Sequence, residues 1–175
     1  MNEKISKSIG ILFKLSKLKA PKSLLKQIYY SLIHSYLNYN ISSYAGTYDS
    51  HINRLLLLQK RAIRIINKSS FLAHTDPLFY SCKILKVYDM YRLNIGLYMY
   101  DNWETGSYFR SHNHDYNTRN HNSLVPSAAR LTVTQNSISV VGPNIWNSIP
   151  LEIRLSPTRN IFKNRLKAHF LLNYL

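Results

Sequence analysis

The side chains that could carry out metal-assisted chemistry are carboxylates, and the 175-residue chain has only eight of them. Two-metal catalysis on phosphate esters needs acidic side chains that converge on ions about 3.5–4 Å apart. The acids here are scattered singly, and Asp101 stands between Tyr100 and Asn102 at the expected end of a helix. We therefore predict no catalytic residues and no enzymatic activity for this chain as it stands.

A second set of chemically competent residues shares one short polar segment: His112, His114, Asp115 and His121. Their spacing matches no closed zinc site, so we interpret them as solvated loop residues. Cys82 is the only cysteine, so an internal disulfide is excluded. We interpret it as a small buried core residue. The five glycines form no phosphate-binding loop. The sequence predicts neither a metal nor a cofactor.

The strongest signal is charge, because 23 Lys and Arg oppose 8 Asp and Glu, for a formal net charge of +15. Residues 1–70 hold twelve basic and two acidic residues, residues 121–175 hold six and one, and the middle is balanced. Such an excess attracts phosphate polymers or anionic membrane surfaces. No run approaches the ~18–20 apolar residues of a spanning helix, and no signal-peptide core is present. We expect an intracellular protein, in the nucleus or cytoplasm, with no membrane span; no feature indicates its oligomeric state.

Hydrophobic periodicity predicts the elements that carry these charges. The expected fold class is mainly α, with a helical block (residues 1–102), a polar connection (103–130) and a small tail (131–175). The tail is expected to have short β segments and a C-terminal helix. The predicted helices are Lys4–Leu18, Pro21–Leu37, His51–Asn67 with Ser50 as N-cap, a short helix starting near Asp76, Val87–Asn102, and one from Ser156–Pro157 to Leu172.

The third predicted helix has the side chains best suited to contact phosphate: Arg54, Lys60, Arg61, Arg64 and Lys68. Positions 54, 61 and 68 are seven residues apart, so they line up along one face. Guanidinium groups add bidentate geometry, and such a stripe supports contact with backbone phosphate rather than with bases. An ordinary solvated helix face is the alternative interpretation.

The tail has two β-prone runs, residues 131–134 and 138–141, followed by the turn signal Gly142–Pro143–Asn144. Trp146 is the largest apolar side chain of this region, and we predict that it anchors the tail on the helices. The last helix places a second basic set beside its apolar stripe, which we include among the expected nucleic-acid contacts: Arg159, Lys163 and Lys167.

Four motifs in a fixed order carry a resemblance to a known family. They are LLQKRAIRII at 57–66, YNTRN at 116–120, GPNIWNSIP at 142–150 after Ser137, and FKNRLK at 162–167. Together they resemble the carboxy-terminal region of reverse transcriptases from LINE-type (non-LTR), jockey-like retrotransposons. Residues 28–39 are similar to the helical thumb that follows the polymerase palm in that family.

The resemblance implies a thumb that holds the backbone of a template–primer RNA or DNA duplex, next to a palm that performs RNA-directed DNA synthesis. Tyr98–Asn102 departs from the family's Tyr-any-Asp-Asp signature because Tyr100 replaces the first aspartate. Neither a palm nor an endonuclease is in this sequence, so the expectation is a non-catalytic fragment whose partner is the missing palm. Two alternatives stay open. One is a functionless relic that folds poorly without its palm; the other is a membrane-surface or acidic-partner binder that uses Lys4–Leu18.

Overall fold

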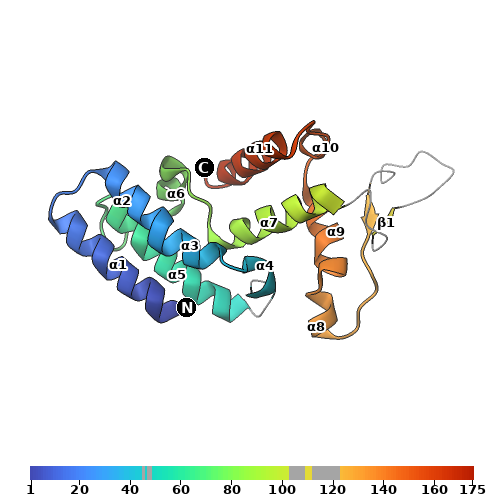
Figure 1. Ribbon diagram of the computed structural model, residues 1–175, viewed down its shortest axis with the longest axis horizontal. Coiled ribbons are helices and arrows are strands. Elements are labelled where there is room, and N and C mark those ends of the chain that lie inside the picture. Colours follow the sequence, from blue (N-terminus) through green and yellow to red (C-terminus); the bar gives the residue numbers. More distant parts are fainter. Residues whose placement is uncertain (45, 47–48, 103–108, 112–122) are drawn as a thin grey trace. The chain divides into compact units, whose positions relative to one another are not determined.

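The computed structural model describes residues 1–44, 46, 49–102, 109–111 and 123–175. Within these residues the chain is mainly helical, which confirms the predicted fold class (Figure 1). The chain divides into two compact units, residues 1–90 with 169–175 (unit 1) and residues 91–168 (unit 2). The domain boundaries predicted from composition, at residues 102 and 130, are a different division and stay a prediction.

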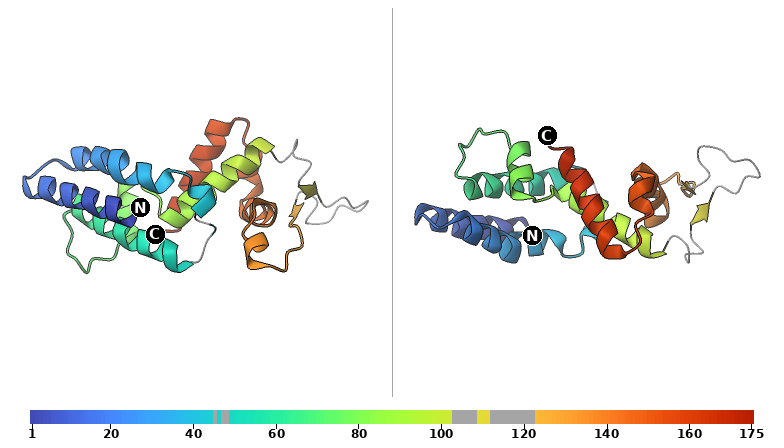
Figure 2. Two further views of the ribbon diagram at one scale, coloured as in Figure 1. Left: turned by 60° about the horizontal axis from the view of Figure 1, so that its bottom comes forward. Right: turned by 90° about the horizontal axis from the view of Figure 1, so that it is seen from above.

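Unit 1 is built on three helical segments that lie side by side. Helices α1 and α5 run in the same direction, and the continuous segment α2–η1–α3 runs the opposite way (Figures 1 and 2). Its elements are α1 (Asn2–Lys17), α2 (Lys22–Ile28), the π-helix η1 (Tyr29–His34), α3 (Ser35–Asn38), α4 (Ile41–Tyr44), α5 (Asp49–Ile66), α6 (Asp76–Cys82), the start of α7 (Val87–Asn102) and the end of α11 (Arg159–Leu172).

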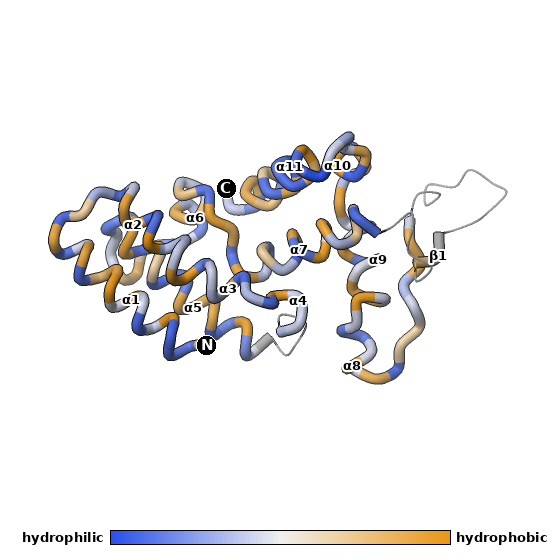
Figure 3. Tube along the Cα trace, viewed as in Figure 1, coloured by the Kyte–Doolittle hydropathy of each residue, from blue (hydrophilic) through white to orange (hydrophobic). Residues whose placement is uncertain are grey.

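The predicted amphipathic faces position these helices. In α1 the residues Ile5, Ile9 and Leu12 are buried, as their spacing predicts, and apolar and polar residues alternate along α1 and α5 in Figure 3. One detail of the prediction is wrong. Helix α5 begins at Asp49, so Ser50 lies inside the helix, whereas an N-cap residue keeps a non-helical backbone.

Three helices of unit 1 end on lysines with a left-handed backbone: Lys19 after α1, Lys68 after α5 and Lys83 after α6. After α5, the N–H of Lys68 donates to the carbonyl of Ile65 (3.1 Å), and the N–H of Ser69 donates to that of Arg64 (3.0 Å). This is the bonding of a C-terminal cap that glycine usually occupies. A lysine there costs about 1–2 kcal/mol of backbone strain, but it places a positive charge at the negative end of the helix dipole.

A fully buried glutamine ties α5 to the rest of unit 1. Gln59 donates from Nε2 to the hydroxyl of Tyr29 (2.9 Å) and to the carbonyl of Leu85 (2.8 Å). Its Oε1 accepts a hydrogen bond from the N–H of Val87 (3.0 Å). Since a buried polar group without partners costs free energy, Gln59 and the backbone before α7 satisfy each other.

The chain's last residues return to unit 1 through Tyr174. Its buried hydroxyl donates to the Asp89 carboxylate and accepts from the N–H of Lys86 (3.0 Å). The Lys86 ammonium lies 4.3 Å from the Tyr174 ring centroid and pairs with Asp76 at 2.9 Å. The C-terminal segment is therefore part of the core of unit 1.

Unit 2 combines helices with one short strand pair. Strands β1 and β2 are antiparallel, with Arg110 opposite Val125 and Ser111 opposite Leu124. The described elements are α7 from residue 91, β1 (Arg110–Ser111), β2 (Leu124–Val125), α8 (Thr132–Gln135), α9 (Ile138–Ser148), α10 (Leu151–Arg154) and α11 to residue 168.

The β segments predicted at 131–134 and 138–141 are wrong, because residues 132–134 lie in α8 and residues 138–141 lie in α9. No described strand pairs with either run, and a helical turn satisfies its own backbone groups. In α9 the buried positions Gly142, Pro143 and Trp146 lie at helical spacing. Tertiary burial thus overrides the β propensity of the β-branched residues before them.

The predicted turn at residues 142–144 also lies inside α9. A Cβ on Gly142 would come within 2.6 Å of the Met99 sulfur, so this glycine serves close helix packing rather than a turn. Pro143 cannot donate to the carbonyl of Ser139, which instead accepts from the N–H of Ser127 at 3.2 Å. The helix therefore tolerates an internal proline because a neighbouring segment replaces the lost bond.

Candidate nucleic-acid interface

The basic residues predicted on α5 do not all share one site. Arg54, Arg61 and Lys68 are exposed, whereas Lys60 and Arg64 are half-buried. Between them, the buried side of the helix supplies core residues such as Ile63 and Ala62. The structure brings three of the five predicted residues to one groove, and it places Arg54 and Lys60 elsewhere on the helix.

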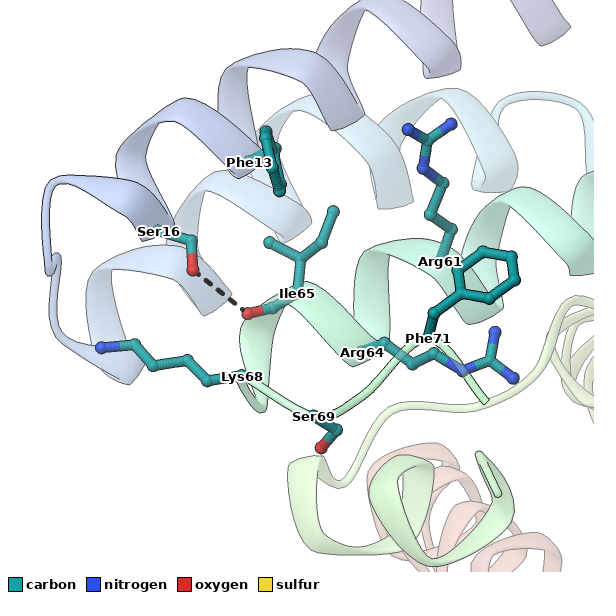
Figure 4. Close-up of a pocket in the computed structure, with 8 residues that line it drawn as sticks. All are labelled: Phe13, Ser16, Arg61, Arg64, Ile65, Lys68, Ser69 and Phe71. Atoms are coloured by element: carbon teal, nitrogen blue, oxygen red, sulfur yellow. Dashed lines mark hydrogen bonds between the residues drawn. The ribbon is translucent and has the colours of Figure 1, made fainter. Parts of the chain in front are cut away.

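The groove lies between α1 and the C-terminal end of α5 and has a volume of about 460 Å³ (Figure 4). This volume falls in the range of about 300–1,000 Å³ that is usual for small-ligand sites. Its lining residues come from α1, α5 and the segment that follows α5: Phe13, Ser16, Arg61, Arg64, Ile65, Lys68, Ser69 and Phe71.

Hydrogen bonds hold two sides of this groove in place. The hydroxyl of Ser16 donates to the carbonyl of Ile65 at 3.5 Å, which links α1 to the last turn of α5. Arg64 donates from Nε to the carbonyl of Ala73 at 3.0 Å, and its guanidinium lies 6.0 Å from the ring centroid of Phe71. Arg64 therefore fixes the segment after α5 while its charge stays beside an aromatic ring.

Every charged side chain that lines the groove is positive. None of the eight lining residues is acidic, and no ion pair of the described residues involves Arg61, Arg64 or Lys68. The left-handed cap positions Lys68, and Arg61 lies two helical turns before it on the same exposed face. Charges that no carboxylate neutralises are available to bind an anion, and phosphate is the anion that guanidinium groups bind bidentately.

The second predicted basic set belongs to unit 2 and has a different environment. Arg159 pairs with Asp101 through its Nε at 2.9 Å and is not a free cation. Lys163 is exposed and Lys167 is half-buried on the same helix.

Trp146 is almost fully buried, with 2% of its surface exposed. Its ring lies against Phe162 of α11, with centroids 5.9 Å apart, and Phe162 in turn stacks on Tyr100 of α7 at 4.6 Å. Arg154 of α10 lies 6.0 Å from the centroid of the indole. The indole is thus one ring of the aromatic core of unit 2.

The potential metal ligands are dispersed over the described residues. There, no three His, Cys, Asp or Glu side chains come close enough together to hold a metal ion. Asp101 pairs with Arg159, and Cys82 is buried beside Asn67, whose Nδ2 donates to its sulfur at 3.2 Å. The predicted loop residues His112, His114, Asp115 and His121 lie outside the described part of the chain. No described helix combines the length and apolar character that crossing a bilayer requires.

Sequence reasoning missed the two phenylalanines of the groove. Phe13 is 49% exposed and Phe71 is 79% exposed. Phe13 stands among the lysines of α1, off its apolar stripe, and Phe71 follows two serines in a connection. A large aromatic residue on the polar face of a helix was the available signal.

Three comparisons with known proteins give no match. No family model matches the chain, and neither a curated protein nor a solved structure is similar to it at a significant level. What the groove can bind therefore follows from its own geometry and charge.

Proposed function

We propose that this chain is a non-catalytic module that contacts the phosphate backbone of RNA or DNA through the groove between α1 and α5. We further propose that it corresponds to the thumb and tail of a LINE-type reverse transcriptase, whose chemistry belongs to a palm. The observation that carries the proposal is a groove whose charged lining residues, Arg61, Arg64 and Lys68, are all basic and have no acidic partner among the described residues.

The overall charge supports the same conclusion. A formal charge of +15 draws polyanions to the whole molecule, and the groove gives that attraction a definite place. Contacts made by several cations to backbone phosphate release counterions, so affinity must fall steeply as salt rises. Sequence discrimination is not expected from such contacts.

Binding of the full chain to a labelled RNA–DNA duplex, measured by fluorescence anisotropy over a range of salt concentrations, tests the proposal. With three or more phosphate contacts, we expect the logarithm of the association constant to fall with a slope of about −3 or steeper against log salt. A flat slope, or no binding at low salt, contradicts the proposal.

Lysines in the left-handed caps provide a matched pair of variants. Lys68→Gly removes one charge from the groove. Lys83→Gly removes one charge from a residue that has the same left-handed backbone but does not line the groove. Both changes relieve strain, so both variants should be at least as stable as the parent chain. We expect only Lys68→Gly to flatten the salt slope, by about one unit. Equal slopes for the two variants would show that the groove is not the contact surface.

The relation to reverse transcriptases has its own test. An open reading frame upstream of codon 1 that encodes a Tyr-any-Asp-Asp hairpin would support it, and purified palm should then bind this chain. Stop codons in that region, together with poor expression and no cooperative thermal melt, would favour the functionless relic.

A second candidate function rests on α1. Three of its large apolar residues are exposed beside its lysines: Ile11 (47%), Phe13 (49%) and Leu18 (78%), the last at the helix end. An amphipathic basic helix of this kind can lie on an anionic membrane surface. Flotation with anionic vesicles separates the two candidates, since Leu18→Ser should abolish membrane binding and leave duplex binding intact.

A further inference from the structure

The groove combines its cations with two exposed aromatic rings, a feature that phosphate contact alone does not require. Figure 4 shows Phe13 from α1 and Phe71 from the segment after α5 on either side of Ile65, with Arg61 and Arg64 on the side of Phe71. Nearly four-fifths of the Phe71 surface is open to solvent. Most of this ring is therefore free to contact a ligand, and burying it against one would be favourable.

We infer that this groove binds an unpaired nucleotide of single-stranded RNA or DNA, with its base stacked on Phe71 and its flanking phosphates bound by Arg61 and Arg64, the two cations on the Phe71 side of the groove. The inference rests on the proposed function and adds the strand state of the ligand. Aromatic rings inside a positively charged groove are the arrangement that binds single strands, because every base has a π-face.

The geometry favours an unpaired base over a paired one. Within a duplex each base is already stacked on its neighbours, and extracting it costs a few kcal/mol. A single strand offers its bases without that cost. Phe71 therefore adds affinity for single strands only, whereas the cations attract both forms of nucleic acid.

The position of the ring is set by its surroundings. Arg64 bonds the carbonyl of Ala73 at 3.0 Å and lies 6.0 Å from the Phe71 centroid. One guanidinium thus holds the backbone just after Phe71 and lies near its ring. Arg61 and Arg64 form no ion pair among the described residues, and the bond to Ala73 uses only the Nε of Arg64, so both guanidinium groups remain available for phosphate.

Three probes of equal length separate base stacking from charge: a fluorescein-labelled single strand of uniform pyrimidine sequence, an abasic strand with the same backbone, and a blunt duplex. Anisotropy titrations use the full chain and its Phe71→Ala, Phe71→Trp and Leu72→Ala variants. Leu72 is the matched control, because it is 87% exposed, adjacent in sequence and not part of the groove lining. Circular dichroism confirms that these exposed substitutions leave the fold intact.

We expect Phe71→Ala to weaken binding of the single strand by about 5- to 100-fold. Its affinity for the abasic strand and the duplex should stay within about twofold, as should all affinities of Leu72→Ala. The Phe71→Trp variant should retain single-strand affinity, and its added indole emission should be quenched by the base-containing strand but not by the abasic one.

Several results would overturn the inference. Equal weakening of the abasic strand by Phe71→Ala would show that the ring only orders Arg64. Equal effects of the Phe71 and Leu72 substitutions would show an unspecific apolar surface, and an effect confined to anionic phosphatidylglycerol vesicles would assign the ring to a membrane. If the parent chain binds all three probes with a steep salt slope but Phe71→Ala changes none, only this inference fails. If no probe binds at low salt, the proposed function fails with it.

Discussion

Helices α5 and α11 look alike in sequence, since each carries regularly spaced cations beside an apolar stripe, but their cations have different environments. Arg61 on α5 and Lys68 just after it have no carboxylate partner among the described residues and line a groove. On α11, Arg159 pairs with Asp101 at 2.9 Å. Periodicity assigns a cation to a face, but its neighbours decide whether its charge is available for a ligand.

The cores of the two units also differ in composition. Unit 1 contains hydrogen-bonded polar side chains, with Gln59 and Tyr174 each bonded to backbone groups. The described core of unit 2 relies on stacked rings and on glycines that let helices approach, since a Cβ on Gly96 or Gly142 would lie 2.8 or 2.6 Å from a neighbouring side chain. The groove thus belongs to the unit whose core contains the fully buried, hydrogen-bonded Gln59.

The largest expected effect tests the dependence of unit 1 on Gln59. Gln59→Leu leaves the carbonyl of Leu85 and the N–H of Val87 buried without that partner, so we expect a loss of about 3–5 kcal/mol in the free energy of unfolding. Urea titrations followed by circular dichroism measure it. The control Gln27→Leu changes an exposed residue of α2 and should shift stability by less than about 0.5 kcal/mol. Similar values for both variants would refute a polar core in unit 1.

High pH should destabilise unit 1 through two buried tyrosines, Tyr29 and Tyr174, and the half-buried Tyr44. Burial raises the pKa of Tyr44 to about 12, and it also raises the pKa of Tyr29 and Tyr174. Because the unfolded chain then releases its tyrosine protons at lower pH than the folded chain, stability is complete below about pH 10 and falls as pH rises above it.

The Tyr174→Phe variant isolates one of these groups. It removes the bonds to Asp89 and Lys86, so we expect it to cost about 1–3 kcal/mol near neutral pH. Between about pH 10 and 12 it should lose less further stability than the parent chain does, as measured by urea titrations at each pH. An identical alkaline slope in both proteins would show that Tyr174 does not titrate with unfolding.

Two glycines sharpen the contrast between the units. Gly142→Ala puts a Cβ 2.6 Å from the Met99 sulfur, so we expect a loss of about 1–3 kcal/mol in unit 2. Gly10→Ala, on the exposed face of α1 with open space around it, should stabilise unit 1 by about 0.5–1 kcal/mol. Thermal melts of both variants measure the difference, and the same sign in both would contradict this account of Gly142.

The smallest expected effect is on the salt dependence of nucleic-acid binding, compared between Arg61 and the ion-paired Arg159. Arg61→Gln should flatten the salt slope of nucleic-acid binding by about one unit, and Arg159→Gln by less, because Asp101 already neutralises Arg159. Asp101→Asn frees Arg159 and should raise affinity by up to about fivefold. Equal losses from the two arginine substitutions would remove the distinction between α5 and α11.

The sequence by itself determined the helical character of unit 1, because amphipathic periodicity follows directly from burying one face of a helix. The predicted ranges of the first helix and of Val87–Asn102 match α1 closely and α7 fully. It also determined the excess of positive charge and which α5 side chains would be basic, since composition does not depend on packing.

Only the tertiary structure decided which of those basic side chains line the same groove. The groove is lined by both Phe13 and Phe71, residues 58 positions apart in the chain, and no local pattern encodes that they line the same groove. Packing likewise decided that the β-prone run before Gly142 is helical and that Lys68, just after α5, has a left-handed backbone. Local propensities differ by about 1 kcal/mol or less per residue, and burying a helix face contributes more than that.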